Sequence, residues 1–562
     1  MHFDLVLKGG RVVDGCGLPG YTADVGIAGG RIARIGRIDA PARRSWNADG
    51  LVVAPGFIDV HTHYDVQLDW DPLATPSVWH GVTTVLAGNC GFTLAPARPQ
   101  DVDWLAGMLT RVEGMSRAAL AAGWRFAGGG FADYWGRLDG RLGVNVGSYV
   151  GHSAVRRFVM GEAASERAAS PAEIAEMQEL VRQGMREGAI GFSTSQVEIH
   201  RGEDGRPVPS NHAAPEEIVA LCAVLAEFDR GAVEIIPRSF SEGYDEADRR
   251  LLLEIYRASG KPVELNPLIP SNTHPFGWQR ALEWLREANA QGGRFYPMSS
   301  VNKLEAHLRL CDTFLFDEVP AFREALCLPE PRRSSALRDP ALRARVAEGL
   351  ADTSGRSFTL DLASLLVEEA TVPANAALVG RSVGEIAAER GQAPLDCFLD
   401  LSLSEDLRMN FEAAMAPGAR EFIESLNRAA LAEPFVMPGS SDGGAHLASF
   451  CGADYSTRLL TDWVPSALTL EQAVHRLTGM PAMVHGLEGR GFVRVGAQAD
   501  LVLFDTTRLG AGRARLVEDF PGGSARYVVD AEGYEGVIVN GVPVMEKGAA
   551  TGALPGVVLR GA

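Results

Sequence analysis

Cysteine is scarce in this sequence, and no two cysteines stand in a close motif. Seven occur among 562 residues, without a Cys-x-x-Cys pair. An odd number of widely scattered cysteines argues against a disulfide framework and indicates reduced thiols. The seven are Cys16, Cys90, Cys222, Cys311, Cys327, Cys397 and Cys451.

Long apolar runs are also missing, and the first residues show no basic segment followed by an apolar one. We therefore expect neither a membrane span nor a secretory signal. The net charge of −18 makes nucleic acids and anionic membranes unfavourable partners. We expect a soluble, cytoplasmic protein that acts on a small molecule, and a homo-oligomer remains open.

The composition that is present, 46% hydrophobic and 22% charged, is that of a globular chain long enough for more than one domain. Residues 3–54 alternate apolar and polar side chains in short runs broken by glycine, and similar strands recur at 499–505 and 536–541. We predict one small β-sandwich domain built from both chain termini, residues 1–54 plus 486–562.

The central residues, 55–485, alternate β-prone runs with helical patterns. In one such unit, apolar residues at helical spacing across 171–186 precede a strand-like run at 189–193. Repeated units of this kind predict a parallel sheet closed into a (β/α)8-like barrel, with functional groups at the C-terminal ends of its strands. Residues 300–434 lack strong strand signals, so we predict a helical insertion there, before the last barrel strand.

A histidine pair marks the end of the first barrel strand. Residues 57–60 form a short apolar run opened by Pro55 and Gly56, and His61 and His63 follow. Because successive strand side chains alternate faces, the two imidazoles point the same way. Two converging imidazoles make half of a transition-metal site. A pair of hydrogen-bonded core histidines is the alternative.

The run Pro-Gly-Phe-Ile-Asp-Val-His-Thr-His at 55–63 resembles the first barrel strand of the amidohydrolase superfamily. Members of that superfamily hydrolyse amides, imides and related bonds with metal-activated water. The resemblance implies a distorted (β/α)8 TIM-like barrel beside the terminal β-sandwich, in agreement with the pattern of strands and helices.

A second motif surrounds Cys90, between Gly88 and Gly91 after an apolar strand at 82–86. A lone cysteine is usually a small buried hydrophobe. Here Gly-Asn-Cys-Gly-Phe after Gly-Val-Thr-Thr is similar to a narrower group, the N-acyl-D-amino-acid deacylases (D-aminoacylases). The resemblance implies that Cys90 is a metal ligand, where other amidohydrolases use a carboxylated lysine or a glutamate.

A third motif delivers Asp442 from a last strand at 435–438 into a glycine-rich loop. An Asp before Gly-Gly is ordinarily a turn residue. The resemblance implies instead that Asp442 binds the metal and serves as the acid/base that moves a proton between water and the leaving amine. It also makes His446 a candidate for assisting Asp442 or binding substrate. The resemblance continues beyond the barrel, so it covers nearly the whole chain.

Two histidines of the family pattern are missing. D-aminoacylases carry metal-binding histidines on the fifth and sixth barrel strands, which we place at 233–238 and 262–267. Ile236 stands at the first position, and Asn266 or Pro267 at the second. What remains is a set of two histidines, one cysteine and one aspartate that suits tetrahedral Zn2+. We expect one zinc per chain, held by His61, His63, Cys90 and Asp442, with a second metal left open.

Four further residues are candidates for binding substrate. His152 and His200 follow the predicted third and fourth strands, and a hydrogen-bonded loop histidine is the alternative for each. Arg201 and Arg238 have the chemistry to clamp a substrate carboxylate through paired hydrogen bonds. A solvated salt bridge is the alternative for both arginines.

These observations predict a zinc-dependent amidohydrolase that deacylates an N-acyl-D-amino acid, with Asp442 as acid/base. A first alternative keeps the chemistry but changes the substrate to a cyclic amide or imide. A second alternative is a barrel that has lost two ligands and only binds a small molecule, because a fold does not determine a function.

Overall fold

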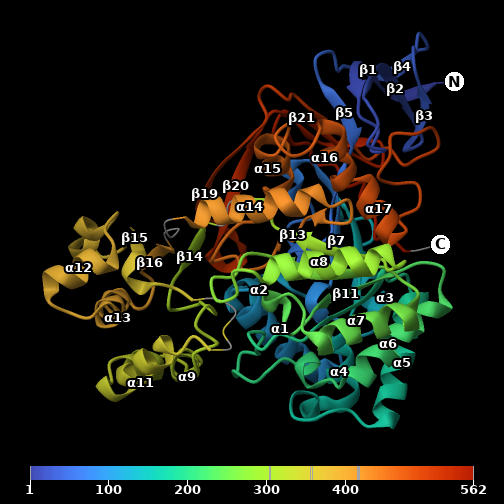
Figure 1. The fold of residues 1–562 in the computed structure, drawn as a ribbon. Helices are drawn as coiled ribbons and strands as arrows, with labels where there is room; N and C mark the ends of the chain where they lie inside the picture. The colour runs from blue at the N-terminus through green and yellow to red at the C-terminus, as the bar shows by residue number, and fades with distance from the viewer. Residues whose placement is uncertain (1, 303–304, 355, 357–358, 414–417, 561–562) are drawn as a thin grey trace.

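The computed structural model describes residues 2–302, 305–354, 356, 359–413 and 418–560. Figure 1 shows three regions: a barrel, a sheet that combines the first strands of the chain with strands of its C-terminal part, and a lobe of yellow helices and strands to one side of the barrel. Within the described residues, no helix combines the length and apolarity that a bilayer crossing requires.

The barrel has eight parallel strand positions, the third split into two short strands. Parallel pairing runs from β6 through β7 to β8 and from β9 through successive strands to β17. A parallel bridge between Thr62 and Gly443 joins the last strand position to the first. The predicted (β/α)8 barrel is therefore confirmed. Its strands are β6 (Phe57–Asp59), β7 (Val82–Ala87), β8 (Asn145–Ser148), β9 (Val150–Gly151), β10 (Gly191–Ser195), β11 (Ala232–Ile236), β12 (Val263–Leu268), β13 (Phe295–Ser299) and β17 (Met437–Pro438).

Helices between the strands cover the barrel, and their ends follow from local sequence. Helix α5 (Pro171–Arg186) begins with a capping box, in which Ser170 and Glu173 satisfy each other's backbone N–H groups. It buries Met177 and Val181, one turn apart, against the strands. The other barrel helices include α4 (His152–Met160), α6 (Pro215–Ala223), α7 (Glu246–Ser259), α8 (Gly277–Ala290) and α14 (Ala419–Ala432).

Both chain termini enter one sheet, in the order β23-β22-β21-β18-β5-β1-β2-β3, with β4 paired to β1. The predicted terminal β-domain is thus present. The hairpin of β19 (Gly510–Phe520) and β20 (Ser524–Glu532) leaves this sheet and reaches the barrel, where Tyr527 N–H donates to Leu447. The remaining strands are β1 (Phe3–Val12), β2 (Tyr21–Ala28), β3 (Arg31–Ile35), β4 (Ala42–Asn47), β5 (Val52–Pro55), β18 (Leu501–Phe504), β21 (Tyr534–Val539), β22 (Val542–Glu546) and β23 (Ala549–Ala550).

The chain returns to the barrel after β23. Gly556 pairs with Leu142, and Val558 pairs with Val146 on β8. The last described residues therefore attach to the barrel, although we had assigned everything after residue 485 to the β-sandwich.

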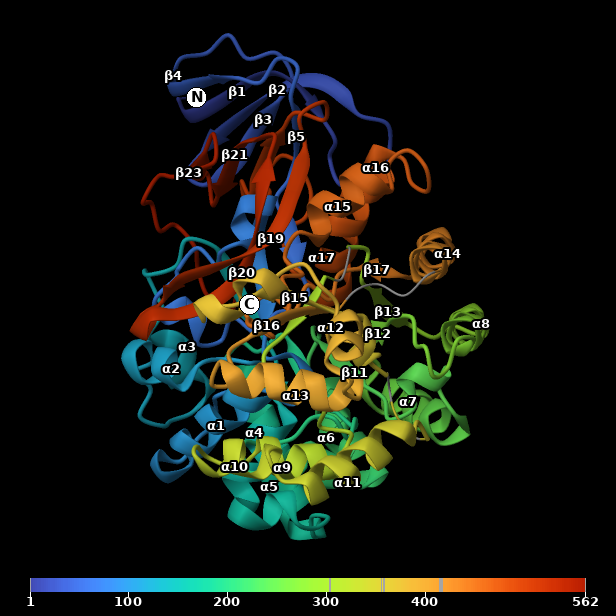
Figure 2. The same cartoon turned by 90° about the vertical axis from the view of Figure 1, so that its left-hand side faces the viewer.

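The lobe beside the barrel is the insertion that the sequence predicts, but it is not purely helical. Its strands β14 (Ala306–Leu308), β16 (Asn410–Ala413) and β15 (Leu365–Glu369) form an antiparallel sheet. Phe316, Phe322, Phe398 and Phe411 belong to its separate apolar core. Its helices, best separated in Figure 2, are α9 (Pro320–Leu326), α10 (Arg332–Leu337), α11 (Pro340–Ala351), α12 (Val383–Arg390) and α13 (Pro394–Ser404).

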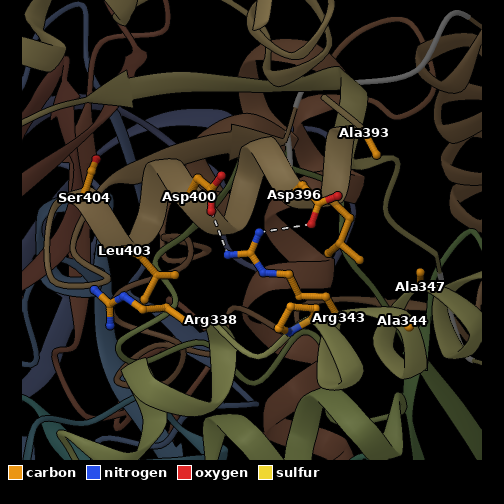
Figure 3. A pocket seen from close by; sticks show the side chains of 11 residues that line it. Arg338, Arg343, Ala344, Ala347, Ala393, Asp396, Asp400, Leu403 and Ser404 are labelled. Atoms are coloured by element: carbon orange, nitrogen blue, oxygen red, sulfur yellow. Dashed lines mark hydrogen bonds and ion pairs between the residues drawn. The ribbon is translucent and has the colours of Figure 1, made fainter. Parts of the chain in front are cut away.

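An open groove of about 790 Å³ runs between α11 and α13 in this insertion. Arg343 crosses it and donates to Asp396 at 3.0 Å and to Asp400 at 2.7 Å (Figure 3). The charge of Arg343 is thus matched by two aspartates of the facing helix. We assign this groove a structural role, in which the arginine ties the two helices together.

Candidate metal centre

His61 and His63 follow β6 at the mouth of the barrel. Both side chains are buried, and their ring centroids lie 5.3 Å apart. Together with Cys90 they form a group whose possible ligand atoms all lie within 4.8 Å of one another. The structure therefore brings together the three residues that the first two motifs single out.

Cys90 stands in a tight turn directly after β7. The residue adopts a left-handed backbone conformation with a φ of 57°, between Gly88 and Gly91, which have φ values of 77° and 78°. This turn places the sulfur atom 3.4 Å from Nε2 of His61. The buried carboxylate of Glu234 on β11 accepts the Cys90 backbone N–H at 2.8 Å and so holds the turn in place.

Asp442 reaches the same histidines from the loop after β17. Its Oδ1 lies 3.3 Å from Nε2 of His61 and 3.8 Å from Nε2 of His63. The Asp442 backbone N–H donates to the His61 carbonyl oxygen, and the His63 N–H donates to Gly443. These backbone bonds join the first and last strand ends. About a fifth of the Asp442 side chain remains exposed, so the carboxylate is accessible from outside the histidine pair.

The electrostatics of the group favour a cation. Burial, together with the negative charges of Glu234, Glu113 and Asp442, raises the pKa of the Cys90 thiol well above its usual value. Burial alone would raise the pKa of Asp442, but the hydrogen bond from His61 and the nearby imidazole charges lower it to about 2. Two imidazoles, a sulfur and a carboxylate form a donor set that suits a transition-metal ion.

Unpartnered buried atoms give a further test of that fit. Nδ1 of His61 and of His63, and Oε1 of Glu113 and of Glu234, make no hydrogen bond within the described part of the chain. Buried polar atoms are nearly always paired in native proteins. The opposite ring nitrogens, Nε2 of His61 and of His63, face Asp442. A metal bound at these Nε2 atoms would explain why buried polar atoms gather around the two rings.

Strands five and six lie where the sequence places them, as β11 and β12. Ile236 ends β11 as a buried apolar residue. Asn266 turns toward the group, with Nδ2 3.3 Å from Nε2 of His61 and Oδ1 accepting from Ser440. Two strands that carry imidazoles in the family pattern therefore present an aliphatic side chain and an amide here.

Sequence reasoning missed Glu234 and Glu113. Glu234 is the one charged residue in the otherwise apolar β11, two positions before Ile236, and that placement is a usable signal. Glu113 follows α1 (Val102–Val112) at its C-cap, and its Oε1 lies 3.2 Å from Nδ1 of His63. Nothing in the local sequence distinguishes Glu113 from an ordinary helix-end glutamate.

His200 and His446 both lie near the Asp442 carboxylate. Nδ1 of His200 bonds Ser195 at 2.8 Å, and its ring meets Phe92 edge-on at 5.0 Å. Burial, with the nearby charge of His446, lowers the pKa of His200 to about 3. His446 stacks on Phe314 of the insertion at 4.7 Å. Their placement fits the prediction that they bind substrate.

His152 requires a correction. Its Nδ1 bonds Thr194 at 2.8 Å and its Nε2 bonds Glu217 of α6 at 2.9 Å. Glu217 also pairs with the buried Arg156. Since both ring nitrogens are engaged behind the barrel wall, His152 is a hydrogen-bonded structural histidine, which was the alternative for this residue.

The two arginine candidates differ. Arg201 is half-buried, donates to the Gly205 carbonyl oxygen at 3.2 Å, and lies near Arg323 of the insertion, which together with burial lowers its pKa. Arg238 follows β11, is exposed, and makes no hydrogen bond or ion pair with the described residues. Of the two, Arg238 keeps its guanidinium available for a substrate anion.

Comparison with known proteins agrees with this architecture. The pattern of the Amidohydrolase family (Amidohydro_3) matches residues 45–293 and 335–545. The chain belongs to the amidohydrolase family. The family prediction and the prediction of an enzyme acting on non-peptide carbon–nitrogen bonds are both confirmed.

Individual relatives resemble the chain over its whole length. D-aminoacylase from Alcaligenes xylosoxydans xylosoxydans is 31% identical, covering 99% of this chain and 97% of that protein. A solved structure of D-aminoacylase is 29% identical with a TM-score of 0.65 over 100% of both chains. That structure has a binuclear metal centre, in which one metal activates the enzyme and a second metal attenuates it. The N-acyl-D-glutamate deacylase from Bordetella bronchiseptica, solved with zinc and a phosphonate inhibitor, is 26% identical with a TM-score of 0.68 over 100% of both chains.

Proposed function

We propose that this amidohydrolase removes the acyl group from N-acyl-D-amino acids at a zinc centre held by His61, His63, Cys90 and Asp442. The observation that carries the proposal is the convergence of these four side chains from three strand ends of one barrel. The full-length similarity to deacylases of that substrate class supports the choice of substrate.

The residues of the chain divide the chemistry among them. In sites of this kind Zn2+ acidifies water and polarises a carbonyl oxygen. Asp442, held by the backbone of His61 and partly exposed, takes the proton from the attacking water and passes it to the departing nitrogen. His200 and His446 flank this carboxylate on the accessible side and contact the bound substrate.

The carboxylate of the substrate needs a cation. Arg238 stands beyond the end of β11 with an exposed guanidinium that forms no ion pair with the described residues, and a guanidinium suits a carboxylate through two parallel hydrogen bonds. We assign it that role. Arg201 is held closer to the insertion and is the second candidate.

Strands five and six support the proposal of one zinc per chain. Ile236 offers no ligand atom, and Asn266 is engaged with Ser440. Because two imidazoles of the family pattern are absent, a second metal lacks its usual ligands. The seven cysteines of the chain are all free thiols, which supports a cytoplasmic location.

The test combines metal analysis with a substrate panel on one preparation. We expect about one zinc per chain and turnover of N-acyl-D-amino acids in preference to their L-enantiomers. Turnover of hydantoins or other cyclic amides alone would replace the proposed substrate with the cyclic alternative. Zinc-loaded protein that binds but turns over neither class would favour the binding-only barrel.

A further inference from the structure

Each metal-site histidine presents its two ring nitrogens to different neighbours. Nε2 of His61 faces the ligand group, 3.3 Å from Asp442 and 3.4 Å from Cys90, while Nδ1 faces Oε1 of Glu234 at 3.9 Å. His63 repeats the arrangement. Its Nε2 lies 3.8 Å from Asp442 and its Nδ1 lies 3.2 Å from Oε1 of Glu113.

The two glutamates are deeply buried and incompletely satisfied. Glu234 has no exposed surface and Glu113 is 1% exposed, yet Oε1 of each lacks a well-aligned hydrogen bond within the described residues. Removing a carboxylate from water costs several kcal/mol unless charge and hydrogen bonds compensate. Each of these carboxylate oxygens lies beside a histidine Nδ1. Their burial does not stabilise the metal-free fold, which indicates a functional role.

A third buried glutamate lies on the neighbouring strand, away from the candidate ligands. Glu264 on β12 is the register partner of Glu234 on β11 and is equally buried. It accepts the hydroxyl of Tyr149 at 2.5 Å, and Nε2 of His485 lies 3.0 Å from its other oxygen. Within the described residues, Oε1 of Glu264 also makes no well-aligned hydrogen bond, as in Glu234, but the imidazole beside it belongs to His485 and not to a candidate metal ligand.

We propose that Glu113 and Glu234 are the positioning residues of the metal centre. Their carboxylates lie beside Nδ1 of His63 and of His61, at 3.2 and 3.9 Å, and their negative charge favours the tautomer with the proton on Nδ1, which leaves Nε2 free for the metal. Glu234 in addition fixes Cys90 through its backbone N–H, so one carboxylate orients two ligands. This inference rests on the metal centre proposed above and concerns how its ligands are held.

The inference also explains what strand five contributes. The strand has no imidazole for the metal, but through Glu234 it still reaches the centre, on the same inward face as Ile236. In the family pattern, strand five supplies a metal-binding histidine. In this chain, strand five supplies Glu234, whose carboxylate lies behind the candidate ligand His61.

The test measures zinc affinity by competition with a chromogenic chelator, using the full-length protein. We expect Glu113→Gln and Glu234→Gln to weaken zinc binding about 10- to 100-fold, the usual effect of losing such a partner. Glu234→Gln has the larger effect, because Glu234 presents one oxygen to His61 and the other to the Cys90 N–H, and glutamine replaces one of these acceptors with a donor NH2. Glu264→Gln, equally buried and register-matched, is the control and binds zinc like the wild type.

Two further readouts separate positioning from a purely structural role or from direct ligation. Asp in place of either glutamate keeps the charge and recovers part of the affinity, and it carries the test where a Gln variant does not fold. The visible absorption spectrum of the cobalt-loaded protein reports the coordination number of the metal. We expect the Gln variants to show the same coordination number as the wild type. A changed coordination number would mean direct ligation and overturn the proposal, as would unchanged zinc affinity.

The wild-type control distinguishes this inference from the proposed function. Wild-type protein that binds no zinc would remove the metal centre itself. Wild-type protein that binds zinc, with both Gln variants indistinguishable from it, would remove only the positioning role of Glu113 and Glu234.

Discussion

The barrel mouth and the insertion groove treat charge in opposite ways. In the groove, Arg343 meets Asp396 and Asp400 at hydrogen-bond distance, on regular helices. At the mouth, buried nitrogen and oxygen atoms of His61, His63, Glu113 and Glu234 have no hydrogen-bond partner among the described residues. Four non-glycine residues there also adopt left-handed backbone conformations, which are costly and cluster at functional sites. They are Cys90, Ser440, Asp442 and His446, with φ values of 57°, 57°, 49° and 50°.

The difference separates two uses of polar residues. In the groove, the charge of Arg343 is satisfied within the protein, and the ion pairs hold two helices together. The mouth maintains an arrangement that is unfavourable until something binds, which is the property expected of a preorganised site. Substitutions should therefore affect ligand binding and catalysis at the mouth, and stability alone at the groove.

Removing the thiol should have the largest effect at the mouth. Cys90→Ala deletes a ligand, so we expect zinc affinity to fall by more than the roughly 100-fold that an outer partner contributes. In the wild type, the zinc-bound Cys90 resists alkylation and becomes reactive after chelation. Chelator competition and mass spectrometry of the alkylated peptide measure both. Full metal content in Cys90→Ala would assign the cysteine a structural role.

Asp442→Asn should have the second-largest effect at the barrel mouth. Asparagine keeps the shape and one oxygen of the side chain but cannot take up and return a proton. We expect kcat to fall by roughly 10² or more while much of the zinc and the fold remain. Zinc content, circular dichroism and turnover should be measured on one preparation. Near wild-type turnover with zinc retained would exclude Asp442 from proton transfer.

Metal removal should make stability at the mouth depend on pH. In the metal-free protein, burial raises the pKa of Glu234 to about 7, from an ordinary value near 4.5. Its stabilising contribution is therefore fully present below about pH 4.5 and is lost as pH rises through about 7, a change on the order of 3 kcal/mol. We expect zinc to raise the melting temperature more at pH 8 than at pH 5. An equal rise at both would contradict the assignment.

Arg343→Ala should have the smallest effect, a loss of stability limited to the insertion groove. Both aspartates are partly exposed, so the ion pairs contribute only about 0.5–1 kcal/mol. We expect the melting temperature to fall by a few degrees at most, with zinc content and kcat unchanged. A loss of zinc in this variant would show that the insertion and the mouth are coupled.

Much of the site was predictable because its residues lie in short local motifs. His61, His63, Cys90 and Asp442 each end a strand, and parallel strands of a barrel bring such ends to one face. The same logic located strands five and six, observed as β11 (Ala232–Ile236) and β12 (Val263–Leu268). Local sequence was sufficient wherever the backbone path alone decides the position.

The sequence-based predictions failed where the structure depends on the direction of a side chain or on pairing between distant strands. His152 follows a strand as predicted, but its ring turns to Glu217, and no local pattern reports that choice. The insertion sheet was missed because β16 pairs with strands roughly 50 to 100 residues earlier in the chain. Glu113 reaches His63 only through the packing of α1 against the barrel mouth.

The terminal sheet sets the order in which this chain matures. β5 (Val52–Pro55) pairs with β18 (Leu501–Phe504), and residues near 556–558 pair with β8 of the barrel. Since a ribosome delivers the chain from its N-terminus, strands made early wait for partners made more than 400 residues later. We expect the nascent chain to carry unpaired strand edges for most of its synthesis, and the sheet and the barrel to be completed only after residues 501–504 and 556–558 have been made.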